Sequence, residues 1–152
     1  MRYWDSSALI PLLVEAPRSD ALRSLAAADG SIAAWWGSPV ECCSAIGRIR
    51  RAGGLTIGEE DRIRRSLDAL AESWTEIEPT ADLRGLAARL LLNHPLRAAD
   101  ALQLASALVW SGPRVAGHDF VCLDERLRFA ARNEGFNVLP ECGGPRAPAG
   151  NS

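Results

Sequence analysis

Apolar positions along the chain fall into two kinds of segment. Compact apolar runs typical of buried strands lie at residues 1–4, 31–36, 120–123 and 137–139, with a further short run at 75–78. Between them, apolar residues recur at helical spacing at 7–14, 18–28, 40–51, 57–73, 81–92, 97–110 and 125–133. This alternation predicts an α/β fold, an α/β/α sandwich around a central, mainly parallel sheet of four to five short strands.

Capping residues mark the starts of several predicted helices. Thr56 and Glu59 have the spacing of a capping box. Serine is a good N-cap, so we expect a serine directly after the first strand to begin the first helix. Ser38 is expected to cap another helix, with Pro39 as its first residue.

Composition is typical of a soluble globular protein. The chain has 152 residues, of which 47% are hydrophobic and 24% charged. No apolar run is long enough to span a bilayer, and no signal peptide precedes the first strand, so we expect a cytoplasmic protein without membrane contact. From residue 140 onward the sequence lacks periodicity. We therefore predict one domain over residues 1–139 and a flexible tail over residues 140–152.

Charge and basic-residue usage limit the possible chemistry. The formal net charge is -2 at pH 7, so a nucleic-acid role requires a local basic patch. Every basic residue is arginine. The absence of lysine excludes Schiff-base lysines and Walker-type phosphate-binding lysines.

Cysteine and histidine patterns argue against a zinc site or a disulfide scaffold. The four cysteines form no Cys-x-x-Cys pair, and the chain has two histidines. We expect the cysteines to behave as small buried hydrophobic residues: Cys42, Cys43, Cys122 and Cys142.

Four acidic residues stand at the ends of strands or the starts of helices. Asp5 and Asp124 follow apolar strands, while Glu41 and Asp100 lie in first helical turns. Each has an ordinary structural explanation when taken alone. Asp124 can cap a helix, Glu41 can favour a helix dipole, and Asp100, among small and apolar neighbours, can pair with Arg97.

Taken together, the four acids predict a shared site. In a parallel sheet their positions fall on one edge, and four converging carboxylates cannot all stay ionised without cations. Oxygen ligands alone suit Mg²⁺ or Mn²⁺. Such a pocket typically activates water and binds a phosphodiester, so the pattern favours metal-dependent phosphodiester hydrolysis.

The segments around these acids resemble the motifs of PIN-domain ribonucleases, and most closely the VapC-type toxins of toxin–antitoxin pairs. The motifs follow one another in the family's order from residue 1 to about residue 139. They read YWDSSAL around Asp5, SPVE ending at Glu41, LRAADALQLA around Asp100 and FVCLDERL around Asp124.

The resemblance implies a PIN-like α/β/α fold and endonucleolytic cleavage of RNA at Mg²⁺ or Mn²⁺ held by Asp5, Glu41, Asp100 and Asp124. It implies that Ser6 supports the acids by hydrogen bonding. It also implies a homodimer and a VapB-type antitoxin that blocks the site. The sequence departs from the motifs at Cys122, where members often carry Thr or Ser, and Asp119 is a second candidate for the role of Asp124.

Arginine and tryptophan side chains are further candidates for RNA contacts. Tryptophans in apolar runs are expected in the core: Trp4, Trp35 and Trp36. The arginines lie on two predicted helices and could hold an RNA backbone: Arg48, Arg50 and Arg51, and Arg126, Arg128 and Arg132.

Other functions stay open or are disfavoured by missing motifs. A nuclease acting on another nucleic acid and a non-catalytic PIN-like binding module are the alternatives. An aspartyl phosphatase is disfavoured because Asp5 is not part of an Asp-x-Asp motif. A dinucleotide enzyme is disfavoured because no Gly-x-Gly-x-x-Gly follows the first strand.

Overall fold

The computed structural model describes residues 1–142 and has one five-stranded sheet with parallel pairing throughout, in the order β3-β2-β1-β4-β5. This confirms the predicted α/β sandwich and its upper number of strands. The strands are β1 (Arg2–Trp4), β2 (Ile32–Trp35), β3 (Thr75–Ile77), β4 (Asp119–Val121) and β5 (Asn137–Leu139).

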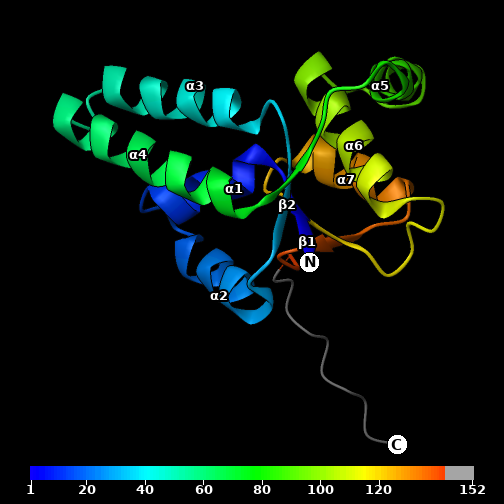
Figure 1. The fold of residues 1–152 in the computed structure, drawn as a ribbon, viewed down its shortest axis with the longest axis horizontal. Helices are drawn as coiled ribbons and strands as arrows, with labels where there is room; N and C mark the ends of the chain where they lie inside the picture. The colour runs from blue at the N-terminus through cyan, green and yellow to red at the C-terminus, as the bar shows by residue number, and fades with distance from the viewer. Residues whose placement is uncertain (143–152) are drawn as a thin grey trace, which may run out of the picture.

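Helices cover both faces of the sheet (Figure 1). One face carries α1 (Ser6–Leu13), α2 (Ser19–Asp29), α3 (Ser38–Arg51) and α4 (Ile57–Ser73). The other carries α5 (Ala81–Asn93), α6 (Ala98–Ser111) and α7 (Glu125–Asn133). Within residues 1–142, no helix is long and apolar enough to cross a membrane.

Alternation along the strands produces two separate hydrophobic cores. Tyr3 and Phe120 belong to the core beneath α5–α7, whereas their neighbours Trp4 and Val121 belong to the core beneath α1–α4. Because successive strand side chains point to opposite faces, short apolar strands suffice to fill both layers.

Several predicted helix starts differ in the structure. The capping box at Thr56 and Glu59 is present. Asp5, rather than a serine, caps α1, because its carboxylate accepts the Ser7 backbone N–H. Ser38 is not a cap, since α3 begins at Ser38 after Gly37 and its buried hydroxyl instead meets a side chain of α6.

Two further predictions concern residues outside the cores. Trp36 is 52% exposed, so its predicted place in the core was wrong. It follows the last residue of β2 and touches Trp35 edge to face. Most of the predicted tail, residues 143–152, lies outside the described residues, and the tail stays a prediction.

Arg128 on α7 is buried and holds the carboxyl ends of β4 and β5 together. Its guanidinium donates to the backbone carbonyls of Cys122, Leu139 and Pro140, the last over 2.7 Å. The structure thus contradicts its predicted role at the RNA surface, because the side chain is buried and both terminal nitrogens donate to these carbonyls.

We expect Arg128→Met to lower the free energy of unfolding by about 2–4 kcal/mol, because it leaves the carbonyls of Cys122 and Pro140 without donors. Urea unfolding at pH 7 measures this change. Arg132→Met, at an exposed position on the same helix, is the control and should change stability by less than about 0.5 kcal/mol. Equal stability of the two variants would contradict a structural role for Arg128.

Candidate active site

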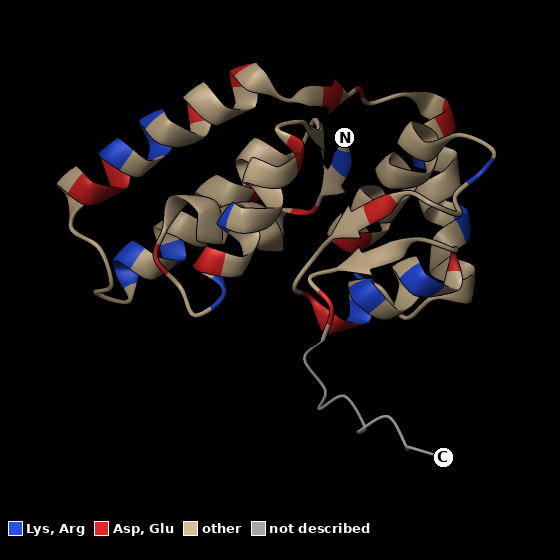
Figure 2. Cartoon of the chain, turned by 90° about the horizontal axis from the view of Figure 1, so that it is seen from below, with Lys and Arg blue, Asp and Glu red and all other residues tan. Residues whose placement is uncertain are grey.

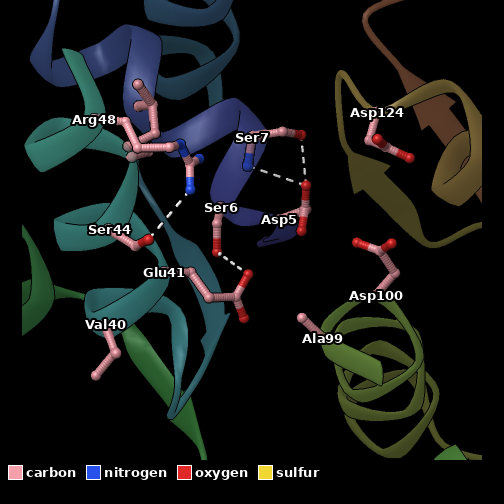
Figure 3. A pocket seen from close by; sticks show the side chains of 12 residues that line it. Asp5, Ser6, Ser7, Val40, Glu41, Ser44, Arg48, Ala99, Asp100 and Asp124 are labelled. Atoms are coloured by element: carbon pink, nitrogen blue, oxygen red, sulfur yellow. Dashed lines mark hydrogen bonds between the residues drawn. The ribbon is translucent and has the colours of Figure 1, made fainter. Parts of the chain in front are cut away.

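All four predicted acids line one cavity at the carboxyl edge of the sheet. The cavity has a volume of about 420 Å³. Asp5 and Glu41 reach it from α1 and α3, while Asp100 and Asp124 reach it from α6 and α7 (Figure 3). The structure therefore brings together four residues that are up to 119 positions apart (Asp5 to Asp124, 124 − 5 = 119).

Asp5 is the most deeply placed of the four carboxylates, with 4% of its surface exposed. Oδ2 accepts hydrogen bonds from the backbone N–H and the hydroxyl of Ser7, the former over 3.0 Å. The Cys122 thiol donates to the same oxygen over 3.5 Å. Burial raises the pKa of Asp5, and the charge of Asp100 adds to the rise.

Glu41 is half-buried, and both of its oxygens have partners. Ser6 donates its hydroxyl to Oε2 over 3.0 Å, and the Gln103 amide donates to Oε1 over 3.2 Å. Burial raises the pKa of Glu41 to about 7, with further contributions from the charges of Asp5 and Asp100. Ser6 thus has the supporting position that the motif resemblance implies.

Asp100 and Asp124 form the opposite wall of the cavity (Figure 3). Asp124 is exposed and caps α7 by accepting the Leu127 backbone N–H over 2.9 Å, as its sequence position predicts. Asp100 is half-buried, and burial raises its pKa, followed by the charge of Asp124.

The carboxylates lack cationic partners in the structure. Within residues 1–142, none of the four forms an ion pair within 4.0 Å, so the expected pairing of Asp100 with Arg97 does not occur. Four oxygen donors in one cavity match the chemistry of Mg²⁺ or Mn²⁺. Within the same residues, no group of three or more His, Cys, Asp or Glu side chains lies close enough together to hold a metal ion as the side chains stand.

Asp119 lies at the other end of the sheet. It is the first residue of β4 and accepts from Arg2 Nε over 2.9 Å. It does not line the cavity, so the geometry favours Asp124 as the fourth acid. Burial raises the pKa of the Cys122 thiol, and the charge of Asp5 raises it further. The thiol therefore stays protonated and can donate to Asp5 as a hydroxyl would.

The predicted arginines have different surroundings. Basic residues lie on helices on both sides of the sheet (Figure 2). Arg48 lines the acidic cavity, and Arg126 lines an adjoining cavity of about 280 Å³ that also includes Asp100 and Asp124. Arg50 instead pairs with Glu60. Arg51 and Arg132 line neither cavity.

Two relevant residues were missed from the sequence. Arg97 lines the adjoining cavity, whereas its sequence position suggests only a partner for Asp100. Gln103 is fully buried and contacts Glu41. A lone amide in the apolar stripe of α6, three residues after Asp100, is the signal that could have revealed it.

The fold matches that of a VapC-type PIN domain, as the comparison with solved structures shows. No family model and no curated protein sequence matches the chain. Among solved structures, it is similar to Mycobacterium tuberculosis VapC20, described as a sarcin-ricin loop cleaving toxin. The identity is 17% and the TM-score 0.64, over 90% of this chain and 97% of that one.

Two structures of a second system are similar to the same extent. FitAcB from Neisseria gonorrhoeae has 15% identity and a TM-score of 0.62, over 91% of this chain and 96% of that one. FitAB bound to the IR36 DNA fragment has 13% identity and a TM-score of 0.62, over 91% and 93%. These likenesses confirm the predicted fold.

The raised carboxyl pKa values predict that the metal-free protein loses stability as pH rises. The folded state retains a proton on Glu41 that the unfolded chain loses near pH 4.5, so this contribution to stability is present below pH 4.5 and is lost as pH rises through about 7. In chelator, Glu41→Gln should therefore recover about 2 kcal/mol relative to wild type between pH 5 and pH 8, or roughly 4–8 °C in Tm.

Thermal melts at both pH values measure this difference. Asp68→Asn, at an exposed position on α4, is the matched control and should follow the wild-type pH dependence. If Glu41→Gln shows the same pH dependence as wild type, the electrostatic strain assigned to the cavity is wrong.

Proposed function

We propose that this protein is a Mg²⁺- or Mn²⁺-dependent endoribonuclease that acts as the toxin of a toxin–antitoxin pair. The observation that carries the proposal is the cavity itself. Four carboxylates from four helices line it, and within residues 1–142 none has a cationic partner. The fold shared with VapC20, a toxin that cleaves the sarcin-ricin loop, supports RNA as the substrate.

The four carboxylates of the cavity would hold the cation in different ways. Asp5 and Asp100 are the proposed central ligands, and Glu41 and Asp124 complete the set directly or through water. A bound cation would supply charge neutralisation and water activation for phosphodiester hydrolysis. Without a cation, burial raises the pKa of Glu41 to about 7, so Glu41 would release a proton when a cation binds beside it.

Arginines at both ends of the acidic cavity can bind the RNA backbone. Arg48 lies on the α3 wall, where it also donates to Ser44 Oγ over 3.2 Å. Arg97 and Arg126 lie in the adjoining cavity. Guanidinium groups on both sides of the carboxylates suit phosphates on both sides of a scissile bond.

A VapB-type antitoxin and a second copy of the chain are the proposed protein partners. The similar structures FitAcB and FitAB, the latter bound to a DNA fragment, support the antitoxin partner. Large apolar side chains are exposed on several helices, as expected for surfaces that protein partners cover: Val40, Ile57, Leu92 and Phe129. Sedimentation of the chain alone, and with its antitoxin, measures both associations.

Asp100→Asn should lower metal-dependent RNA cleavage at least about 100-fold, because it removes a central carboxylate without changing side-chain size. A pool of structured RNAs, incubated with Mg²⁺ or Mn²⁺ and with chelator, measures cleavage. Asp119→Asn is the matched control, since Asp119 lies at the opposite end of the sheet, and it should keep most activity.

Three outcomes would contradict this proposal. Equal cutting by wild type and Asp100→Asn would refute the site, and cutting of DNA instead of RNA would refute the substrate. Tight metal binding without cutting of any nucleic acid would favour a non-catalytic module. In cells, expression without antitoxin should slow growth, and Asp100→Asn should not.

The double change Arg97→Met and Arg126→Met should weaken RNA binding and flatten its salt dependence. Each lost phosphate contact on a single strand reduces the slope of log K against log salt by about 0.7. Binding is measured in the Asp100→Asn background, so that the RNA stays intact. Arg84→Met with Arg89→Met, at exposed positions on α5, provides an equal charge change away from the cavities and should leave the slope unchanged.

A further inference from the structure

Gln103 is a polar residue in the most buried part of α6. Its side chain is 0% exposed, and Leu104 and Ala105 beside it belong to the hydrophobic core. A buried amide is unfavourable unless its donors and acceptor are satisfied, and an apolar side chain of similar size would fill the same space without that requirement. The contacts of this amide therefore need an explanation.

The amide connects four elements of the structure. Its nitrogen lies 2.9 Å from Ser6 Oγ, 3.1 Å from Ser38 Oγ and 3.2 Å from Glu41 Oε1. Its oxygen accepts the Tyr3 hydroxyl over 2.7 Å. Two N–H groups thus serve three acceptors on α1 and α3, while β1 holds the other end of the amide.

The charge of Glu41 determines the orientation of the amide. The ionised carboxylate, which is the form that would hold a cation, can only accept, so in that form the nitrogen of Gln103 must face Glu41 and its oxygen must face Tyr3. The Tyr3 ring is itself held in place, stacked on Phe120 with ring centres 5.3 Å apart. The amide is therefore anchored to the core of the sheet at one end and holds a cavity carboxylate at the other.

Ser6 completes the support of Glu41. Its hydroxyl accepts from Gln103 and donates to Glu41 Oε2 over 3.0 Å, so both carboxylate oxygens are held. Gln103 Nε2, Ser6 Oγ and the two carboxylate oxygens of Glu41 are joined in a closed ring of hydrogen bonds. Such a ring permits one side-chain orientation, with the carboxylate along the cavity wall.

We propose that Gln103 is a positioning residue that holds the Glu41 carboxylate in the acidic cavity by tying it to Tyr3 and the sheet. The proposal rests on the proposed function, because Glu41 matters here as one of the carboxylates that would hold the cation. Gln103 does not line the cavity and acts through Glu41 and Ser6.

The test compares Gln103→Met with Leu104→Met, which places the same side chain at an equally buried position on the same helix. Calorimetric titration with Mn²⁺ and RNA cleavage kinetics are measured for both. Gln103→Met should weaken Mn²⁺ binding and lower kcat, each about 10-fold, with KM for RNA changed less than about 2-fold, because arginines bind the backbone. Leu104→Met should behave as wild type in all three.

Tyr3→Phe provides a second variant that removes only a hydroxyl. It removes the contact that anchors the Gln103 oxygen to the sheet, so it should change Mn²⁺ binding and kcat in the same direction but by about 3-fold. If Gln103→Met fails to fold, Tyr3→Phe alone tests the proposal. Wild-type Mn²⁺ binding and kcat in Gln103→Met, or in Tyr3→Phe where only that variant folds, would overturn the proposal.

Crystal structures of wild type and Gln103→Met separate this inference from the proposed function. A Glu41 carboxylate that turns away from the cavity in the variant supports positioning, even if the wild type cuts no RNA and the nuclease proposal fails. A Glu41 carboxylate that stays in place overturns positioning, whatever the activity.

Discussion

Repulsion between like charges at one edge of a parallel sheet is the constraint on which the rest of this structure depends. Asp5, Glu41, Asp100 and Asp124 share one cavity, and within residues 1–142 no ion pair compensates them. Each lies at the N-terminal end of a helix, as a cap or in the first turn. Partial positive charge at four helix N-termini offsets part of the repulsion, and hydrogen bonds to Asp5, Glu41 and Asp124 offset more.

This arrangement explains why the sheet needs buried polar ties near its carboxyl edge. Side chains that repel one another tend to separate the helices that carry them. Gln103 links α6 to α1 and α3, and Arg128 links α7 to the ends of β4 and β5. Both are fully buried polar residues next to charged ones. Their contacts therefore stabilise the two walls against the charge that those walls carry.

The sequence contained enough information for the fold and for the four acids, because each depends on local patterns. Compact apolar runs, helical periodicity and the capping box at Thr56 are properties of neighbouring residues. Features that depend on residues distant in the sequence could not be predicted from local patterns. Ser38 is a good cap by type, but it accepts from Gln103, 65 residues away. Arg128 has the composition of a surface residue, yet carbonyls of two strands bury it.

Burial of the four acids decreases across the cavity, so the site has a closed end at Asp5 and an open end at Asp124. Asp5 is buried and held by protein donors, Glu41 and Asp100 are half-buried, and Asp124 is exposed beside Arg97 and Arg126. A polyanion is attracted by Arg97 and Arg126 beside the exposed acid and by Arg48 on the α3 wall, and it is repelled by the ionised acids between them. Under the proposed function, the charge distribution favours binding of the cation before binding of nucleic acid, because ionised acids repel phosphate until a cation neutralises them. This order follows from the difference in burial, because solvent screens the charge of Asp5, the deepest acid, least effectively.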